Sequence, residues 1–340
     1  MVKTLSYAYG VPPVSGMLRT QPEDFFVDEV LGFEPDGEGE HVLLQIEKRN
    51  TNTQWLADQL ARFAGIPKRD VSYAGMKDRH AVTRQWYSLG LAGAAEPDWN
   101  NLNIDNVRVL QHARHRRKLR RGTLQGNRFH LVIRNLQGDT ASLESRLQHI
   151  AQAGVPNYFG EQRFGHDGAN LQQAMAMFQG KRIKDRHKRS LYLSAARSYL
   201  FNELLSQRVA RGDWNRAIPG DVMLLAGSNS YFVPEVNDAT IQQRLASFDI
   251  HPSGCLWGKG ETPAQAEAAE LERTLAQAHP VLCRGLEQAG LKQERRALRL
   301  PVADLQWELK APEQCLVLRF FLPAGAYATT VLRELVVTGE

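Results

Sequence analysis

The stretch from Val71 to Trp86, "VSYAGMKDRHAVTRQW", contains one carboxylate, Asp78, in a strongly basic setting. Four basic residues share the stretch with it: Lys77, Arg79, His80 and Arg84. One interpretation is an ordinary surface ion pair. The other is a reactive carboxylate that neighbouring cations keep ionised. The charge pattern alone favours the ion pair, because many loop aspartates lie beside arginines.

The rest of the sequence offers no motif for cofactor or metal chemistry. It has no GxxxxGK[ST] loop, no glycine-rich turn after a strand, no HExxH motif, no acidic cluster at metal spacing and no GxSxG elbow. Its three cysteines, Cys255, Cys283 and Cys315, are scattered, which predicts reduced and mostly buried thiols. We therefore expect no cofactor and no metal, and Asp78 remains as the candidate reactive group.

The charge of the chain is unevenly distributed. The net charge is +5 and the pI is near 9.1, yet the segment from Glu23 to Glu40 has eight acids and no Lys or Arg. That segment carries −8, so the remainder carries +13, because +5 minus −8 is +13. This polarity predicts a polyanionic partner, with nucleic acid as the leading candidate.

Two basic runs could supply the contacts to such a partner. The first, "HARHRRKLRR" at 112–121, has six Lys or Arg, and the second, "KRIKDRHKR" at 181–189, has six against one Asp. Solvated faces are one interpretation and a phosphate-binding cleft is the other, which two separate runs favour. The candidate phosphate ligands are Arg114, Arg116, Arg117, Lys118, Arg120, Arg121, Lys181, Arg182, Arg186, Lys188 and Arg189.

The length of 340 residues suggests two domains, and a hydrophobic fraction of 43 % is sufficient for real cores. No signal-peptide pattern and no run of membrane-spanning length is present, so we expect a cytoplasmic protein without a membrane partner. No protein partner is implied. A monomer is favoured over an obligate oligomer, since nothing resembles a long apolar seam.

The order of secondary-structure patterns indicates how the chain is organised. Strand patterns occur at 23–33, 41–48, 71–75, 107–113 and 126–136, and again at 303–310 and 315–323. A helix is expected after the first two strands, with Thr53 as its cap, Gly65 and Pro67 at its end, and an apolar stripe formed by Trp55, Leu56, Leu60 and Phe63. The strand at 71–75 delivers Asp78 into a loop. Helical spacing dominates from about Ala151, at 171–179, 194–210 and 262–278, and a short helix follows at 328–336.

Several long blocks resemble the TruD family of tRNA pseudouridine synthases. The stretch around Asp78 resembles the "GxKDxxAxTxQ" loop of that family, whose Asp is the catalytic residue. Further blocks resemble it in the same order: "PEDFFVDE", "LGFEPDGEGEH", "RKLRRGTLQGNRF", "GVPNYFGEQRFG", "RSLYLSAARSYLFN" and "LPAGAYATTVLREL". The resemblance covers essentially the whole chain and is weakest from about Gly227 to Pro301.

The resemblance implies a fold and a reaction. The fold is α+β: a pseudouridine synthase catalytic domain with a mixed, largely antiparallel sheet, formed by 1–152 together with 302–340, and an inserted, helix-rich α/β TRUD domain at 153–301. The reaction is the isomerisation of uridine to pseudouridine at position 13 of tRNA, with neither cofactor nor metal. Asp78 would act on a flipped-out uridine. Whether it attacks the sugar, attacks the base or abstracts a sugar proton stays open.

The resemblance also implies further site residues, each with a plainer alternative. Phe25 and Phe129 match aromatics near the target base, but both could be core strand residues. Asn127 matches an amide that can bind the uracil edge, and could instead be a turn residue. Arg19 could pair with Asp78 or with a phosphate, or be a surface arginine, and Lys77 matches the family lysine beside the catalytic Asp. At Tyr327 the family more often has Phe, so a buried hydroxyl there would need a partner.

Two functions are therefore carried forward. The first is a tRNA pseudouridine synthase, an isomerase that needs Asp78. The alternative is a non-catalytic RNA-binding or RNA-folding protein that uses the same basic cleft. The presence of Asp78, Asn127 and Phe25 together favours the enzyme, because a binding protein has no need of all three.

Overall fold

The computed structural model describes residues 4–120, 122–235, 238–310 and 312–339. The chain divides into two compact units. The sheet unit consists of Pro13–Glu144, Val302–Ala326 and Val336–Glu340. The helical unit consists of Met1–Pro12, Ser145–Pro301 and Tyr327–Leu335. The domain bounds expected from the sequence, 1–152 with 302–340 and 153–301, stay a prediction.

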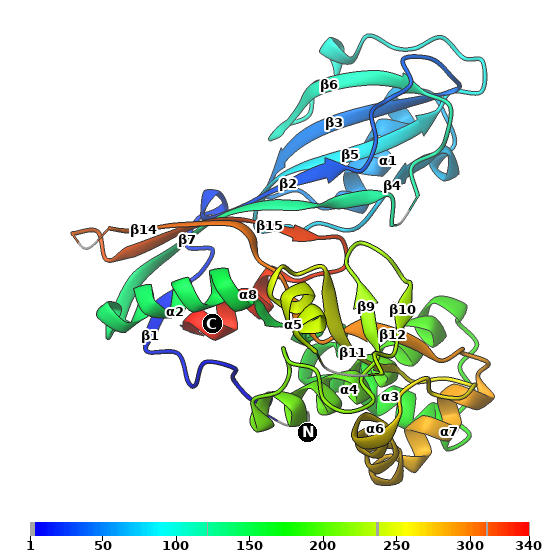
Figure 1. The fold of residues 1–340 in the computed structure, drawn as a ribbon. Coiled ribbons are helices and arrows are strands. Elements are labelled where there is room, and N and C mark those ends of the chain that lie inside the picture. The colour runs from blue at the N-terminus through cyan, green and yellow to red at the C-terminus, as the bar shows by residue number, and fades with distance from the viewer. Residues whose placement is uncertain (1–3, 121, 236–237, 311, 340) are drawn as a thin grey trace. The chain divides into compact units, whose positions relative to one another are not determined.

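One large sheet organises the sheet unit (Figure 1), with the strand order β14-β15-β7-β2-β5-β3-β6. Strand β4 pairs with β5, β1 pairs with β7 and β16, and all described pairs are antiparallel except β2–β5 and β1–β16. The strands are β1 (Val14–Met17), β2 (Phe25–Leu31), β3 (His41–Arg49), β4 (Val71–Tyr73), β5 (Val82–Gly90), β6 (Val107–His115), β7 (Leu124–Gly138), β14 (Ala303–Lys310), β15 (Cys315–Pro323) and β16 (Val336–Gly339). The expected mixed α+β fold with a large sheet is confirmed.

Helix α1 (Thr53–Phe63) packs on one half of this sheet, where Leu56 and Leu60 are buried against β3 and β5. Its cap differs from the expectation: Asn52, not Thr53, accepts hydrogen bonds from the first free N–H groups. Thr53 is the first helical residue, and its hydroxyl turns inward. Trp55 is also misplaced in the expected apolar stripe, since it is 47 % exposed.

The helical unit surrounds the long helix α4 (Arg186–Arg211), which packs against α3, α6, α7 and β11. Its other elements are α3 (Ala169–Phe178), α5 (Ala239–Ala246), α6 (Ala266–Ala278), α7 (Pro280–Gln288), α8 (Ala328–Leu335), and a small sheet of β10 (Tyr231–Phe232), β9 (Met223–Leu225), β11 (Ile250–Leu256) and β12 (Glu294–Ala297), with the separate pair β8 (Val155–Pro156) and β13 (Arg299–Leu300). Helix α2 (Thr140–Ala153) begins in one unit and ends in the other. The three cysteines are buried and free, as expected.

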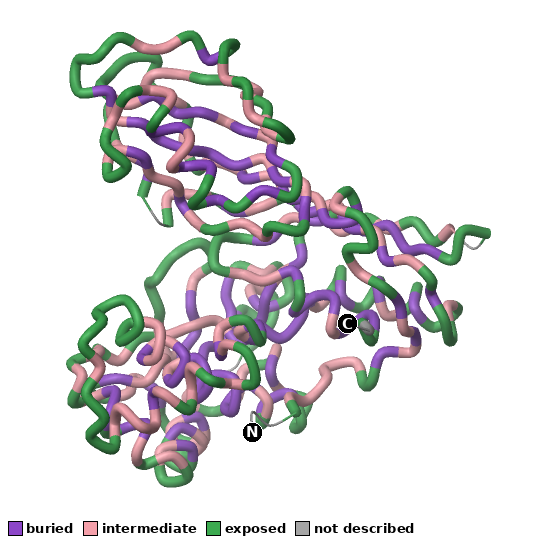
Figure 2. The backbone as a smooth tube through the Cα atoms, turned by 180° about the vertical axis from the view of Figure 1, so that it is seen from behind, coloured by how far each residue is buried: buried purple, intermediate pink, exposed green. Residues whose placement is uncertain are grey.

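Alternation along the central strands gives the large sheet two distinct faces. On β2 and β7 the register pairs Phe25 with Leu131, Val27 with Phe129, and Glu29 with Asn127. These side chains share one face, and the residues between them lie on the other. Figure 2 shows buried residues running along the central strands, with exposed residues gathered in the loops.

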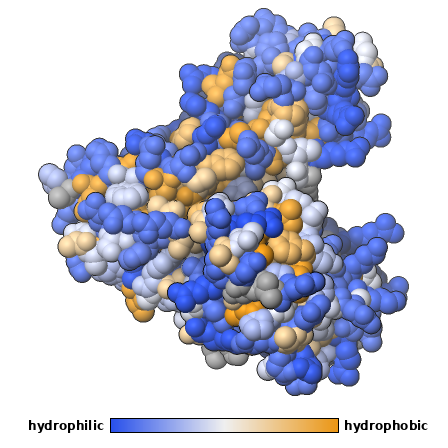
Figure 3. Space-filling model, in the orientation of Figure 1, coloured by the Kyte–Doolittle hydropathy of each residue, from blue (hydrophilic) through white to orange (hydrophobic). Residues whose placement is uncertain are grey.

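The surface is mainly hydrophilic on the face shown in Figure 3, where hydrophobic residues are interrupted by hydrophilic ones. Within the described part of the chain, no helix has both the length and the apolar character to cross a membrane.

Candidate active site

Asp78 lies in the loop between β4 and β5, and its side chain is 33 % exposed. One carboxylate oxygen is 2.6 Å from the guanidinium of Arg19. The other accepts a hydrogen bond of 3.2 Å from the main-chain N–H of His80. The carboxylate is therefore held by an ion pair and a local turn, with part of its surface open to a reactant.

Arg19 is fixed by more than its ion pair. Its backbone has a φ of 57°, a left-handed conformation that costs a non-glycine residue free energy and tends to persist at functional sites. Its guanidinium carbon lies 4.3 Å from the centre of the Phe25 ring, a cation–π contact. Arg19 is an exposed residue that pairs with Asp78, as the first of its expected roles requires.

Aromatic rings extend the site from Arg19 along the sheet. Phe25 meets Phe129 edge-on at 6.4 Å between ring centres, and Phe129 stacks on Phe320 at 5.3 Å. Phe25 is 5 % exposed and Phe129 is 8 % exposed. Both rings therefore belong to the core, which agrees with the plainer alternative. The Phe25 ring also contacts the guanidinium of Arg19, the residue that pairs with Asp78.

The basic neighbours in the sequence are not the cations that meet Asp78. The ammonium of Lys77 pairs with the buried carboxylate of Glu29. Arg84 pairs with Glu47 at 2.9 Å, and its guanidinium lies over Phe26, on the opposite face of the sheet. The expectation that the loop's own cations surround Asp78 is wrong for these two residues, because Lys77 turns to Glu29 and Arg84 lies on the other face of the sheet.

Two buried charged residues near the loop, Glu29 and Lys48, were not predicted from the sequence. Glu29 accepts a 2.7 Å hydrogen bond from the Trp86 main-chain N–H as well as pairing with Lys77. Lys48 is completely buried, and its ammonium donates to the Thr51 carbonyl at 2.7 Å and lies 3.5 Å from the Asp78 carbonyl. Alternation could have found both: Glu29 continues the buried side of Phe25 and Val27, and Lys48 continues that of Val42, Leu44 and Ile46.

Burial shifts the pKa values of both Lys48 and Glu29. Burial is the largest cause, with the Lys77 charge acting in the same direction and Asp78 and Glu29 opposing it, and together they lower the pKa of Lys48 to about 8. Burial likewise raises the pKa of Glu29, against the opposing effect of Lys77. Both groups are therefore sensitive to the loss of a neighbouring charge.

A neutral hydrogen-bond network secures the other end of the loop. Gln85 donates to the Gly75 carbonyl at 2.6 Å and accepts from the hydroxyls of Thr53 and Tyr87, each at 3.1 Å. The Thr53 hydroxyl also accepts from the Lys77 main-chain N–H at 3.1 Å. Both sides of Asp78 are thus tied to the sheet and to α1.

Asn127 lies within β7, between Glu29 on β2 and Leu322 on β15, so the turn alternative is wrong. Its side-chain oxygen is buried and has no hydrogen-bond partner among the described residues. A buried amide oxygen without a partner is costly, which suits an atom that accepts a hydrogen bond from a bound molecule. Glu29 links Asn127 to the Lys77 side of the loop.

Tyr327 belongs to the helical unit, whereas the other site residues above belong to the sheet unit. Its hydroxyl accepts a 2.5 Å hydrogen bond from Arg163, which is the partner that a tyrosine at this position requires. The ring of Phe159 meets Tyr327 edge-on at 6.4 Å. Tyr327 is therefore fixed within its own unit.

The first basic run is largely occupied by contacts within the sheet unit. Arg114 pairs with Glu96 at 2.6 Å, Arg116 pairs with Glu38, and the Lys118 ammonium donates to the Arg69 carbonyl at 2.6 Å. Arg117 and Arg120 are exposed, and Arg121 lies outside the described residues. Part of the acidic segment thus neutralises part of this run.

The second basic run surrounds the N-terminus of α4. Lys181, Arg182, Arg186, Lys188 and Arg189 are all exposed. Asp185 caps the helix by accepting from the N–H groups of His187 and Lys188. These cations lie at the positive end of the helix dipole, so this end of α4 is strongly electropositive.

Taken residue by residue, the arrangement suits a planar base and a sugar beside a carboxylate. It offers the partly exposed carboxylate of Asp78, the almost buried rings of Phe25 and Phe129, and the buried amide oxygen of Asn127, which has no partner among the described residues. No group of three or more His, Cys, Asp or Glu side chains within the described residues is placed to hold a metal ion.

Comparison with known proteins gives one consistent match. The family model for tRNA pseudouridine synthase D (TruD) matches residues 1–181 and 171–335. A tRNA pseudouridine synthase D of Methylococcus capsulatus is 52 % identical over 98 % of this chain and 94 % of its own length. One of Aeromonas salmonicida is 50 % identical over 100 % of this chain and 96 % of its own length.

A solved structure from Methanosarcina mazei, described as a tRNA pseudouridine synthase D, shares the fold. Its TM-score is 0.73 at 23 % sequence identity, over 97 % of this chain and 95 % of that one. The resemblance read from the sequence motifs is thereby confirmed. The chain belongs to the tRNA pseudouridine synthase D family, a family of isomerases.

Proposed function

We propose that this protein converts uridine to pseudouridine at position 13 of tRNA, with Asp78 as the essential carboxylate. The observation that carries the proposal is the position of Asp78: a partly exposed carboxylate, ion-paired with Arg19, beside the Phe25 ring. Family membership supports the reaction. The contacts around Asp78 support the choice of this residue.

The reaction rearranges one nucleoside. The bond from the ribose C1′ to uracil N1 breaks, a bond from C1′ to C5 forms, C5 loses its proton and N1 gains one. No atom and no electron is gained overall, so the chemistry itself needs no cofactor. The target base must leave the helical stack to reach a carboxylate on a protein surface.

Each neighbouring residue receives a role consistent with its contacts. Arg19 orients Asp78, and Phe25 with Phe129 provides an apolar wall for the base. The unpaired oxygen of Asn127 accepts a hydrogen bond from the uracil edge. Lys77 acts through Glu29 and holds the loop rather than touching substrate. Tyr327, held by Arg163, would stack on the base or on its neighbour.

The catalytic domain would comprise 1–152 together with 302–340, with 153–301 as the inserted TRUD domain. The phosphates of tRNA would be bound chiefly by the second basic run, whose side chains are exposed. A tRNA substrate also favours a cytoplasmic location.

Mass-spectrometric mapping of pseudouridine in tRNA tests the proposal in cells. Deleting the gene should remove pseudouridine at position 13, and restoring the protein should return it. The RNA-binding alternative predicts that the modification survives deletion. Position 13 still modified in the deletion strain would overturn the proposal.

A further inference from the structure

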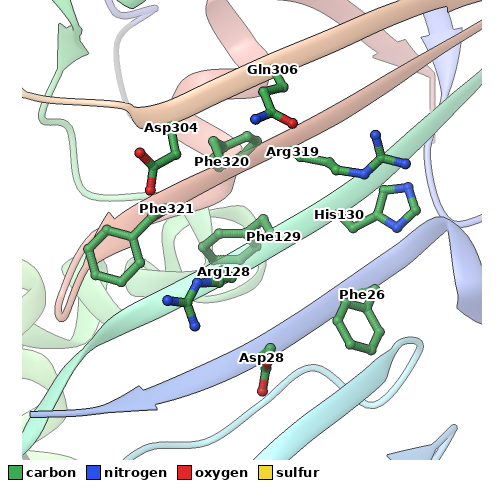
Figure 4. Close-up of a pocket in the computed structure, with 10 residues that line it drawn as sticks. All are labelled: Phe26, Asp28, Arg128, Phe129, His130, Asp304, Gln306, Arg319, Phe320 and Phe321. Atoms are coloured by element: carbon green, nitrogen blue, oxygen red, sulfur yellow. The ribbon is translucent and has the colours of Figure 1, made fainter.

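A pocket lies on the face of the large sheet opposite Asp78 (Figure 4). Its volume is about 260 Å³. Strands β2, β7, β14 and β15 of the sheet unit build it, and its lining residues are Phe26, Asp28, Arg128, Phe129, His130, Asp304, Gln306, Arg319, Phe320 and Phe321. The register separates the faces: Phe25 turns toward Arg19, while Phe26 and Arg128 turn into this pocket.

Two arginines and a histidine, Arg128, Arg319 and His130, line the pocket, and Asp28 on β2 lies opposite Arg128 in the register. Arg319 and His130 are register partners on adjacent strands and lie side by side in Figure 4, and Arg128 is two residues from His130. Within the described residues, no carboxylate forms an ion pair with any of the three. Burial and the Arg319 charge lower the pKa of His130, so the two arginines carry the positive charge. Facing cations are unfavourable unless an anion lies between them.

The ring of Phe321 lies beside these arginines and packs over Gly126. The Phe321 ring lies over Gly126 of β7, where an added Cβ would come within 2.4 Å of the ring. The same Cβ would come within 2.2 Å of the Leu322 carbonyl oxygen, so the neighbouring strand as well as the ring requires glycine at this position. Phe26 supplies a second ring across the pocket, and its other contact is the guanidinium of Arg84 at 5.1 Å.

A strained residue places an acceptor beside the Phe321 ring. Strand β14 has a register shift between Ala303 and Gln306, and Asp304 within it has a φ of 55°. Bulges of this kind redirect side chains and occur often beside functional sites. Figure 4 shows the Asp304 carboxylate directed toward Phe321. Gln306 adds an amide on the same strand.

We propose that this pocket binds one unpaired nucleotide of the RNA substrate. Its base stacks on Phe321, its phosphate lies between Arg128 and Arg319, and its 2′-hydroxyl or base edge donates to Asp304. The inference rests on the proposed function in one respect, that the substrate is tRNA. It adds an RNA contact on the face of the sheet remote from Asp78.

The test measures tRNA affinity for charge variants of the full chain. The variant Arg128→Gln with Arg319→Gln removes two exposed cations from the pocket, and Arg62→Gln with Arg284→Gln removes two exposed cations elsewhere. An unmodified tRNA transcript is titrated at several salt concentrations. We expect about tenfold weaker binding for the pocket variant and a salt slope smaller by about 0.7, since the two arginines share one phosphate and each phosphate contact to a single strand contributes about 0.7. Affinity and slope equal to those of the control pair would overturn the proposal.

Two further arms identify the occupant. Phe321→Leu keeps an apolar side chain and removes the ring, so it should weaken tRNA binding about tenfold through lost stacking. Phe321→Trp should gain a fluorescence signal that tRNA quenches. If uridine monophosphate alone quenches it at micromolar concentration, a free nucleotide is the occupant and the RNA proposal is overturned. Because binding is the readout, wild-type protein that fails to bind tRNA counts against the proposed function instead.

Discussion

The two faces of the large sheet differ in how many of their charged side chains form ion pairs. On the Asp78 face, buried or half-buried charges are partnered: Arg19 with Asp78, and Lys77 with Glu29. On the opposite face, Arg128 and Arg319 are exposed and form no ion pair with any described carboxylate, although Asp28 lies opposite Arg128 in the register. Partnered charges fix a geometry before substrate arrives, whereas unpartnered cations remain available to an anion.

The same contrast separates the two basic runs. In the first, Arg114 and Arg116 are neutralised by Glu96 and Glu38. The second run is exposed around the N-terminus of α4, where the helix dipole adds to its positive potential. Runs that look equivalent in sequence therefore differ in what they can offer to RNA.

The largest expected effect comes from breaking a partnered charge. Glu29→Gln leaves the Lys77 ammonium, only 10 % exposed, without its anion. Removing one member of a buried pair costs about 3 kcal/mol of folding stability. Denaturant unfolding followed by fluorescence measures it, with the exposed Glu308→Gln on β14 as control, which should change stability by less than about 0.5 kcal/mol. Equal midpoints for the two variants would show that the pair is not a stabilising contact.

The contrast between the basic runs predicts a smaller effect on affinity. Replacing Arg186, Lys188 and Arg189 by Gln should weaken tRNA binding roughly tenfold at about 150 mM salt and reduce the salt slope. The matched substitution of Arg114, Arg116 and Lys118 should lower affinity less, because these side chains already have internal partners. Filter binding over a salt series measures both. A larger loss from the first run would reverse the assignment.

The smallest expected effect is the pH dependence that Lys48 contributes to stability. Its folded pKa of about 8 is below the 10.5 of an unfolded lysine, so the unfolded chain binds more protons between these values. Stability from this group therefore rises with pH in that window. Wild type should gain about 1 kcal/mol relative to Lys48→Met between about pH 7.5 and pH 9. If the free energy of unfolding changes with pH by the same amount in both proteins, Lys48 does not have the lowered pKa.

Much of the fold could be predicted from sequence, because periodicity and turn residues are local signals. The strands around Phe25 and Ile46 and the helices of the middle region lie where their patterns indicate. The helix cap was misassigned to Thr53 because Asn52 and Thr53 are both good capping residues, and only the inward hydrogen bond of Thr53 separates them.

The site was predicted less completely, because partners across strands depend on register. Nothing local reveals that Lys77 turns to Glu29 while Arg19, far away in sequence, reaches Asp78. The pocket opposite Asp78 is built from four strands and a bulge, so its residues could not be grouped from sequence spacing alone.

Pseudouridine formation by Asp78→Asn tests the central claim most directly. The substitution keeps the size of the side chain and removes the carboxylate, and with it the charged partner of Arg19. Single-turnover assays with purified enzyme and a tRNA transcript should show a rate at least roughly a thousandfold below wild type. Affinity for tRNA, measured in the same preparation, should change by less than about threefold. A variant that still forms pseudouridine at an appreciable fraction of the wild-type rate would contradict the account.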